Sequence, residues 1–167
     1  MNPHEFLAGA LQLAQDEAVL SPRTVDLLRG LLQNPLSKPE CDDVWQRLSG
    51  ADEARFRRDI RVVVVAGIAQ CLGDHRISAD ERLMVRYVKA LFRIDDGALY
   101  EHCRTDLVDL IGAELATIDG EDQEHGTAAP HVVMLQELLG LSYDQFCDLL
   151  EEARRPLTHW LRDRPGT

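Results

Sequence analysis

The feature that most restricts the fold is a helix-start signal that occurs three times. In each copy a serine is followed three residues later by Glu or Gln, and an apolar stretch with helical spacing comes next. In such a capping box the two side chains accept hydrogen bonds from backbone N–H groups that lack partners at a helix start. The pairs are Ser37 with Glu40, Ser78 with Glu81, and Ser142 with Gln145. We therefore expect helices to begin directly after these serines.

Apolar residues recur at intervals of three and four along most of the chain, as in amphipathic helices. Aromatic residues make up only 5% of the composition, and no hairpin turn is flanked by alternating apolar residues. The four valines at 62–65 fit a buried strand by composition, but the Ala, Arg and Gln around them favour a central helix buried on all sides. The sequence predicts an all-α, compact single-domain bundle of about seven to nine helices built from helical hairpins.

Cap residues and apolar spacing together set the expected helix bounds. Asn2 and Asp52 are expected to cap the first and the central helix, and Asp95 to begin a later one. The expected helices cover residues 3–17, 22–33, 38–49, 53–72, 79–92, 95–117, 131–139 and 143–161. We expect residues 1–55 to pack as N-terminal helices on a core domain of residues 56–162, with 163–167 as a frayed tail. Residues 135–146 also resemble residues 88–99, which leaves an internal pseudo-twofold repeat open.

The formal net charge is −11, from 18 basic and 29 acidic residues. This charge opposes sequence-independent attraction to nucleic acid or to anionic lipid, so neither is an expected partner. Four cysteines lie far apart without a CxxC pair, which favours buried thiols in a reducing compartment. No basic leader and no apolar run long enough for a membrane span is present, so we expect a cytoplasmic protein without membrane insertion.

Residues 73–81 form an acidic elbow between two expected helices, with carboxylates at Asp74, Asp80 and Glu81. A complete EF-hand is excluded, because Gln70 and Leu72 stand where two of its carboxylates belong. A weaker oxygen site for calcium, magnesium or manganese remains a hypothesis, beside the simpler role of Glu81 in helix capping. A second oxygen-rich candidate is the expected loop at 119–126, whose first carboxylates belong to the following residues: Asp119, Glu121 and Asp122.

Other chemistry has weaker signals. Cys71 with His75, and His102 with Cys103, would form a zinc site only if the fold joined the two pairs. The serines are explained by capping, and no HExxH or phosphate-binding glycine loop occurs, so no catalytic residue is assigned. A small metal-dependent hydrolase built from dispersed residues remains the alternative. An arginine cluster is a candidate contact for an acidic partner or simply a solvated helix face; its members are Arg55, Arg57, Arg58 and Arg61.

The elbow carries a family resemblance. Asp74, Ile77 and Glu81 resemble the acidic turn of TerB-like helical domains, the tellurite-resistance family that includes the domain of DjlA-type co-chaperones. The pattern continues through Arg86, Leu91 and residues 94–95, and residues 138–146 resemble the Gly-Leu-Ser step of the second half of that family. His75 departs from the pattern, because glycine is usual there.

The resemblance implies a bacterial helical bundle of seven or more helices that binds rather than catalyses. It also implies a role in responses to metal, membrane or phage stress, with divalent cations at the acidic turns. We therefore expect a non-enzymatic interaction module that binds a protein partner, and a cation at the acidic interhelical turns.

Overall fold

The computed structural model describes residues 1–17, 20–121 and 128–162, without the side chains of residues 17, 118–121, 128–129 and 156–162. These residues form nine α-helices and one 3-10 helix, with no strand among them, which confirms the all-α prediction. The helices are α1 (Pro3–Glu17), α2 (Pro22–Leu31), α3 (Lys38–Gln46), α4 (Gly50–Cys71), η1 (Leu72–Asp74), α5 (Ala79–Leu91), α6 (Ala98–His102), α7 (Arg104–Glu121), α8 (Ala128–Leu139) and α9 (Tyr143–Arg162).

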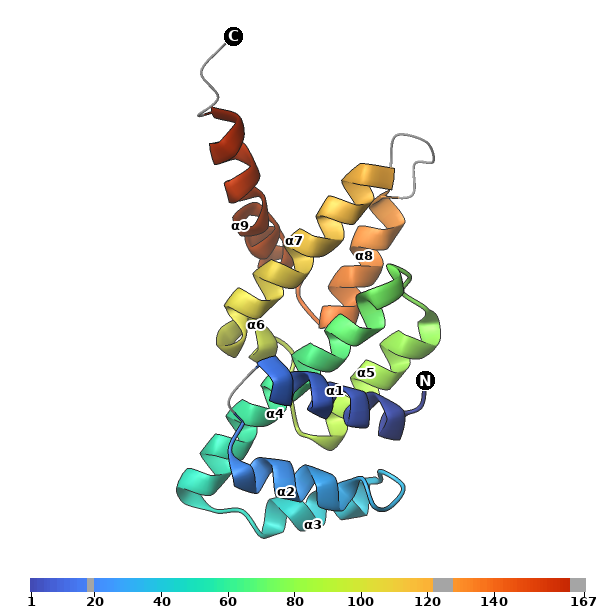
Figure 1. Ribbon diagram of the computed structural model, residues 1–167, viewed down its shortest axis with the longest axis vertical. Coiled ribbons are helices and arrows are strands. Elements are labelled where there is room, and N and C mark those ends of the chain that lie inside the picture. Colours follow the sequence, from blue (N-terminus) through green and yellow to red (C-terminus); the bar gives the residue numbers. More distant parts are fainter. Residues whose placement is uncertain (18–19, 122–127, 163–167) are drawn as a thin grey trace.

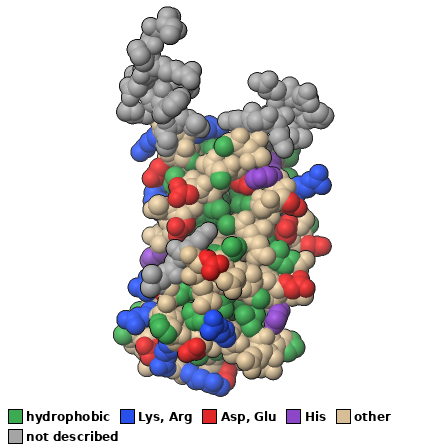
Figure 2. Space-filling model, in the orientation of Figure 1, with side chains coloured by type: hydrophobic (Ala, Val, Ile, Leu, Met, Phe, Trp, Pro, Cys, Tyr) green, Lys and Arg blue, Asp and Glu red, His purple; other side chains and the backbone are tan. Residues whose placement is uncertain are grey.

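Helix α4 runs through the middle of the molecule, with α1 lying across it (Figure 1). Helices α2 and α3 form one end of the bundle, and α7, α8 and α9 extend toward the other. Several Lys and Arg side chains lie at the α2–α3 end of the face shown in Figure 2. Among the described residues, no helix combines the length and the apolarity needed to cross a membrane.

The valine run lies in the buried middle of α4, as the helical interpretation predicts. Val63 and Val64 are fully buried, and the whole segment is helical. Helix α1 packs closely against this part of α4, because glycine at position 67 leaves room for the Phe6 ring. A Cβ atom on Gly67 would lie only 2.2 Å from Cζ of Phe6. The absence of a side chain at position 67 thus sets the separation of the two helices.

A buried carboxylate joins α4 to the start of α2. Asp59 is 1% exposed, and its Oδ2 accepts hydrogen bonds from Ser21 N and Thr24 Oγ1, both at 2.9 Å. Its Oδ1 accepts from the Arg58 guanidinium at 3.0 Å. Burial by itself raises the pKa of Asp59, but the hydrogen bonds from Ser21, Thr24 and Arg58 outweigh it and hold the pKa below its ordinary value.

Trp45 of α3 fills the junction between α3, α4 and the end of α5. Its ring meets Phe56 edge to face at 5.0 Å between centroids. The guanidinium groups of Arg57 and Arg93 lie 4.7 and 5.4 Å from the ring centroid. The indole is 5% exposed, and its Nε1 has no hydrogen-bond partner.

Two of the three capping boxes form as predicted. Ser78 Oγ accepts from Glu81 N at 3.1 Å while Glu81 Oε2 accepts from Ser78 N at 2.8 Å. Ser142 and Gln145 exchange the same pair of bonds at 3.2 and 3.0 Å. Ser37 makes no side-chain cap bond to the backbone, although its hydroxyl donates to the Glu40 carboxylate. The third capping box was therefore wrong.

Several expected helix bounds also differ, most clearly at α4 and at the helix expected from Asp95. Helix α4 begins at Gly50 with Ser49 as N-cap, so Asp52 lies in its first turn rather than at the cap. The helix expected from Asp95 to residue 117 is divided into α6 and α7. Gly97, at φ 81°, delays the start of α6, and Cys103, at φ −127°, leaves the helical region between the two helices.

The self-similar stretches at 88–99 and 135–146 end their helices in the same way. Ile94 N donates to Lys89 O at 2.9 Å after α5, and Leu141 N donates to Gln136 O at 3.2 Å after α8. The residues before them, Arg93 and Gly140, both have positive φ, as in a helix end closed by a left-handed residue. Residues of both loops line the same cavity.

Candidate functional site

Helix α5 carries three basic side chains on the face beside its core stripe. Arg82, Arg86 and Lys89 follow one another at intervals of four and three residues, which places them on one side of a helix. The core stripe is apolar and buried, and consists of Met84, Val85, Val88 and Leu91. Packing of this stripe fixes the direction in which the basic row points.

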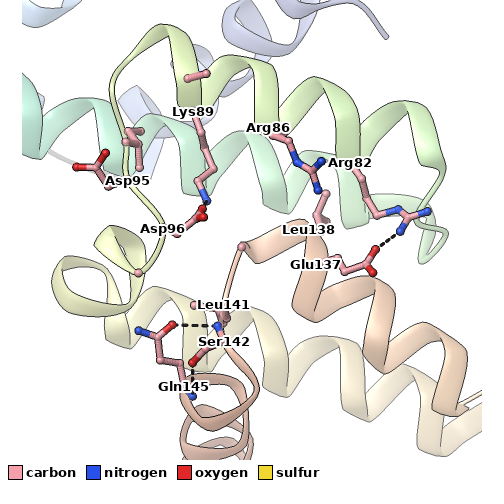
Figure 3. Close-up of a pocket in the computed structure, with 14 residues that line it drawn as sticks. Arg82, Arg86, Lys89, Asp95, Asp96, Glu137, Leu138, Leu141, Ser142 and Gln145 are labelled. Atoms are coloured by element: carbon pink, nitrogen blue, oxygen red, sulfur yellow. Dashed lines mark hydrogen bonds and ion pairs between the residues drawn. The ribbon is translucent and has the colours of Figure 1, made fainter.

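The basic row faces the turn between α8 and α9 across a cavity of about 880 Å³ (Figure 3). We call this cavity the α5 pocket; Arg82, Arg86 and Lys89 line one wall, and residues of the segment 137–145 line the opposite wall. The α5–α6 loop at residues 94–97 closes one end. Segments far apart in the sequence thus share one concave site.

The Lys89 ammonium is the most unusual group of the pocket. The residue is only 6% exposed, yet the one ion pair that its Nζ makes within the described chain is to Asp96 Oδ1 at 3.5 Å. The Asp96 side chain is 95% exposed, so water competes for this contact. A buried ammonium with three donors and one distant acceptor is incompletely satisfied.

Gly140 allows the ammonium to reach this place. Its φ of +67° closes the end of α8, and a Cβ atom on it would lie 2.2 Å from Lys89 Nζ. Glycine is favoured here by the backbone angle, and a larger residue would displace the end of the lysine side chain. The Gly-Leu-Ser step noted in the sequence is part of the pocket wall.

The other two basic groups differ in their partners. Arg82 pairs with Glu137 of α8 across the mouth of the pocket, and its buried Nε has no partner. Arg86 is exposed, lines the pocket and makes no ion pair within the described residues. Figure 3 shows both guanidinium groups extending from α5 toward α8. Arg86 and Lys89 are thus the two cations available to a ligand.

The carboxylates of the predicted acidic site at residues 74–81 either accept local hydrogen bonds or face solvent. Asp74 Oδ1 accepts from Arg76 N at 3.0 Å, Glu81 belongs to the capping box, and Asp80 is exposed in the first turn of α5. The carboxylates of Asp74 and Glu81 thus accept hydrogen bonds from backbone N–H groups of the elbow. Cation binding there stays a prediction. Among the described residues, no group of three acidic, His or Cys side chains is arranged to hold a metal ion.

The second acidic candidate was expected to be a loop from residue 119, but its first residues are helical. Asp119 and Glu121 belong to the last turn of α7, because the helix continues to residue 121. Their side chains, and Asp122 altogether, lie outside the described residues. The structure therefore places two of these residues on a helix and does not test whether they bind a cation with Asp74.

A buried carboxylate between two histidines was missed by the sequence analysis. Glu114 of α7 is 3% exposed; its Oε1 lies 3.0 Å from His75 Nδ1, and its Oε2 lies 3.1 Å from His131 Nε2. His131 is also largely buried, with a side chain that is 14% exposed. His75 has φ 55°, a left-handed conformation that glycine adopts at less cost than a residue with a side chain. In the sequence, the signal that could have revealed this buried carboxylate is a single glutamate within the apolar stripe of α7.

Among the described residues, no cysteine belongs to a group of side chains that could hold a metal ion. Cys41, Cys71 and Cys103 are buried, and burial raises the pKa of these thiols to about 11, 12 and 11. A thiol with a raised pKa remains protonated near neutral pH and is a poor nucleophile. The expectation of buried thiols is confirmed for these three, whereas Cys147 is partly exposed.

The arginine cluster of α4 is partly neutralised by its neighbours. Arg57 bonds Glu53 at 2.7 Å and covers the Trp45 ring, while Arg58 bonds the buried Asp59. Arg55 is exposed without an ion pair in the described residues. The cluster therefore offers fewer free cations than its sequence indicates, and the α5 pocket is the better candidate site.

Comparisons with known proteins find no match for this chain: no family model, no curated protein and no solved structure is similar to it. The candidate site therefore rests on the geometry of the α5 pocket.

Proposed function

We propose that the chain is a non-enzymatic interaction module that binds a protein partner through the α5 pocket. The observation that carries the proposal is the Lys89 ammonium, which is buried in the pocket wall with one exposed acceptor at 3.5 Å. An incompletely satisfied buried donor in a concave site is stabilised when a ligand supplies the missing acceptor.

The lining residues support binding rather than bond-breaking chemistry. Neither His nor Cys lines the described pocket, and the Ser142 hydroxyl already accepts the capping bond from Gln145 N. The volume of about 880 Å³ lies in the range of ligand pockets. The resemblance to TerB-like domains implies the same class of function, and the bacterial stress role that it suggests stays a prediction.

Affinity capture with matched charge reversals tests the proposal. Arg86→Glu reverses a pocket cation, and Arg55→Glu reverses an equally exposed helical arginine on α4, outside the pocket. We expect partners captured from a lysate of the source organism to fall at least tenfold with Arg86→Glu, and to remain with Arg55→Glu, when measured by quantitative mass spectrometry.

The control also identifies the competing surface. Equal recovery with Arg86→Glu would overturn the pocket as the binding site. A selective loss with Arg55→Glu would transfer the interface to the arginine cluster of α4.

A further inference from the structure

Three cations and three carboxylates line the α5 pocket, and they differ in pairing and exposure. Arg82 is neutralised by Glu137, and the remaining carboxylates, Asp95 and Asp96, are exposed to water at the α5–α6 loop. Water screens exposed carboxylates much more than it screens the buried Lys89. A ligand that enters the pocket therefore meets Lys89, whose one ion pair in the described chain is the 3.5 Å contact with the exposed Asp96, and Arg86, which has no ion pair among the described residues.

The facing wall adds neutral donors. Ser142 Oγ accepts from Gln145 N, so its own hydroxyl hydrogen remains available to a ligand. Gln145 uses Oε1 for the bond from Ser142 N, and its Nε2, a donor group, lines the pocket beside Gly97. Donors on both walls suit an acceptor-rich group such as a carboxylate between them.

The deeper part of the pocket is apolar. Ile94, Leu138 and Leu141 line it and are at most 8% exposed, so they form a fixed surface rather than mobile side chains. Beyond the mouth, α5 exposes Leu83 and Tyr87, which are 61% and 43% exposed and lie one turn apart. These apolar surfaces can contact the side chains of a peptide, whereas a small inorganic anion would make no favourable contact with them.

We infer that the α5 pocket recognises an acidic segment of the partner protein, with a carboxylate bound by Lys89 and Arg86 and an adjacent apolar side chain against Leu138 and Leu141. This inference rests on the proposed function and adds the chemistry of the partner.

Fluorescence anisotropy with a labelled ten-residue peptide of glutamate, leucine and serine tests the inference. The matched peptide has glutamine in place of glutamate. We expect the acidic peptide to bind at least tenfold more tightly than its glutamine counterpart. Lys89→Met, which keeps an apolar stem, and Arg86→Gln should each weaken its binding at least tenfold, whereas Arg55→Gln should leave it unchanged.

Lys89→Met removes a buried charge and is checked for its melting temperature, while the exposed Arg86→Gln keeps the test valid if that variant unfolds. Equal binding of the two peptides, or no binding of either, overturns the inference. Displacement of the acidic peptide by an equal concentration of inorganic phosphate overturns it as well, because the pocket would then serve a small anion.

The two tests fail separately. If Arg86→Glu abolishes partner capture but both peptides bind equally, the proposed function stands and recognition of an acidic segment is rejected. Selective binding of the acidic peptide without any effect of Arg86→Glu on capture rejects the pocket as the partner site instead.

Discussion

Asp59 and Lys89 are two buried charged residues that differ in how well hydrogen bonds satisfy their charges. Both are almost fully buried, but Asp59 accepts bonds from three residues at 2.9 to 3.0 Å, whereas Lys89 has one ion-pair partner at 3.5 Å. A satisfied buried carboxylate contributes to folding, while an under-satisfied ammonium is suited to binding. We therefore assign Asp59 to folding, whereas binding by Lys89 is our proposal.

Asp59→Asn tests the structural role. The folded pKa of Asp59 is lowered, so its contribution to stability is present above the unfolded pKa of about 3.9 and is lost as the pH falls through the folded pKa. We expect the variant to lose about 2 kcal/mol of unfolding free energy at pH 7 in urea titrations, and less at pH 3.

Asp26 is an exposed carboxylate on α2, and Asp26→Asn is the control. Its effect should remain within about 0.5 kcal/mol. An Asp59→Asn variant as stable as the control at pH 7 would contradict the role that we assign to the buried carboxylate.

The residues that matter most were the hardest to predict from the sequence. Lys89, Glu114 and Asp59 each look like ordinary polar positions on a helix, because burial depends on what the fold packs against them. Asp74 and Glu81 were easier to notice, since carboxylates cluster in the elbow. Local hydrogen bonds account for both in the structure.

At the scale of elements, the sequence predicted helix starts correctly where the capping hydrogen bonds involve only nearby residues. Ser78 and Ser142 form their capping boxes as predicted, because each needs only residues within one turn. The division of the helix expected from Asp95 was missed, because Gly97, a local breaker with φ 81°, was placed inside that helix and the residue types around Cys103 give no breaker signal. Boundaries set by tertiary contacts are not readable from periodicity.

Matched serine substitutions test this distinction. Ser78→Ala removes a cap that accepts from Glu81 N, whereas Ser49→Ala alters an N-cap residue of α4 that makes no side-chain cap bond. We expect Ser78→Ala to lower the unfolding free energy by about 1 kcal/mol and Ser49→Ala by clearly less, as measured by urea denaturation. Equal losses would show that the capping box does not stabilise α5.

At the scale of the whole molecule, the α1–α4 contact ties the N-terminal helices to the rest. Phe6 and Leu7 of α1 are fully buried in the same hydrophobic core as α4, α5 and α7. The all-α class followed from the sequence because helical periodicity is local. The α5 pocket did not, since its walls come from residues 82–97 and 137–145, whose contact depends on the packing of α5 against α8.

Gly67→Ala tests the α1–α4 contact. The added Cβ would clash with the Phe6 ring, so we expect a loss of about 1 to 3 kcal/mol and a lower melting temperature by calorimetry. Gly30→Ala is the control, because a Cβ there meets nothing within 4 Å and alanine favours a helix. A Gly67→Ala variant that melts with or above Gly30→Ala would show that α1 can move away from α4 without cost.

Trp45 provides a built-in optical reporter of the α3–α4–α5 junction. An indole that is buried beside Phe56, without a hydrogen bond to its Nε1, emits at shorter wavelength than one in water. Separation of this junction would expose the ring and shift its emission to the red. The chain has one other tryptophan, Trp160, so a Trp160→Phe background assigns the whole signal to Trp45. Fluorescence then follows the loosening of this junction without any added label.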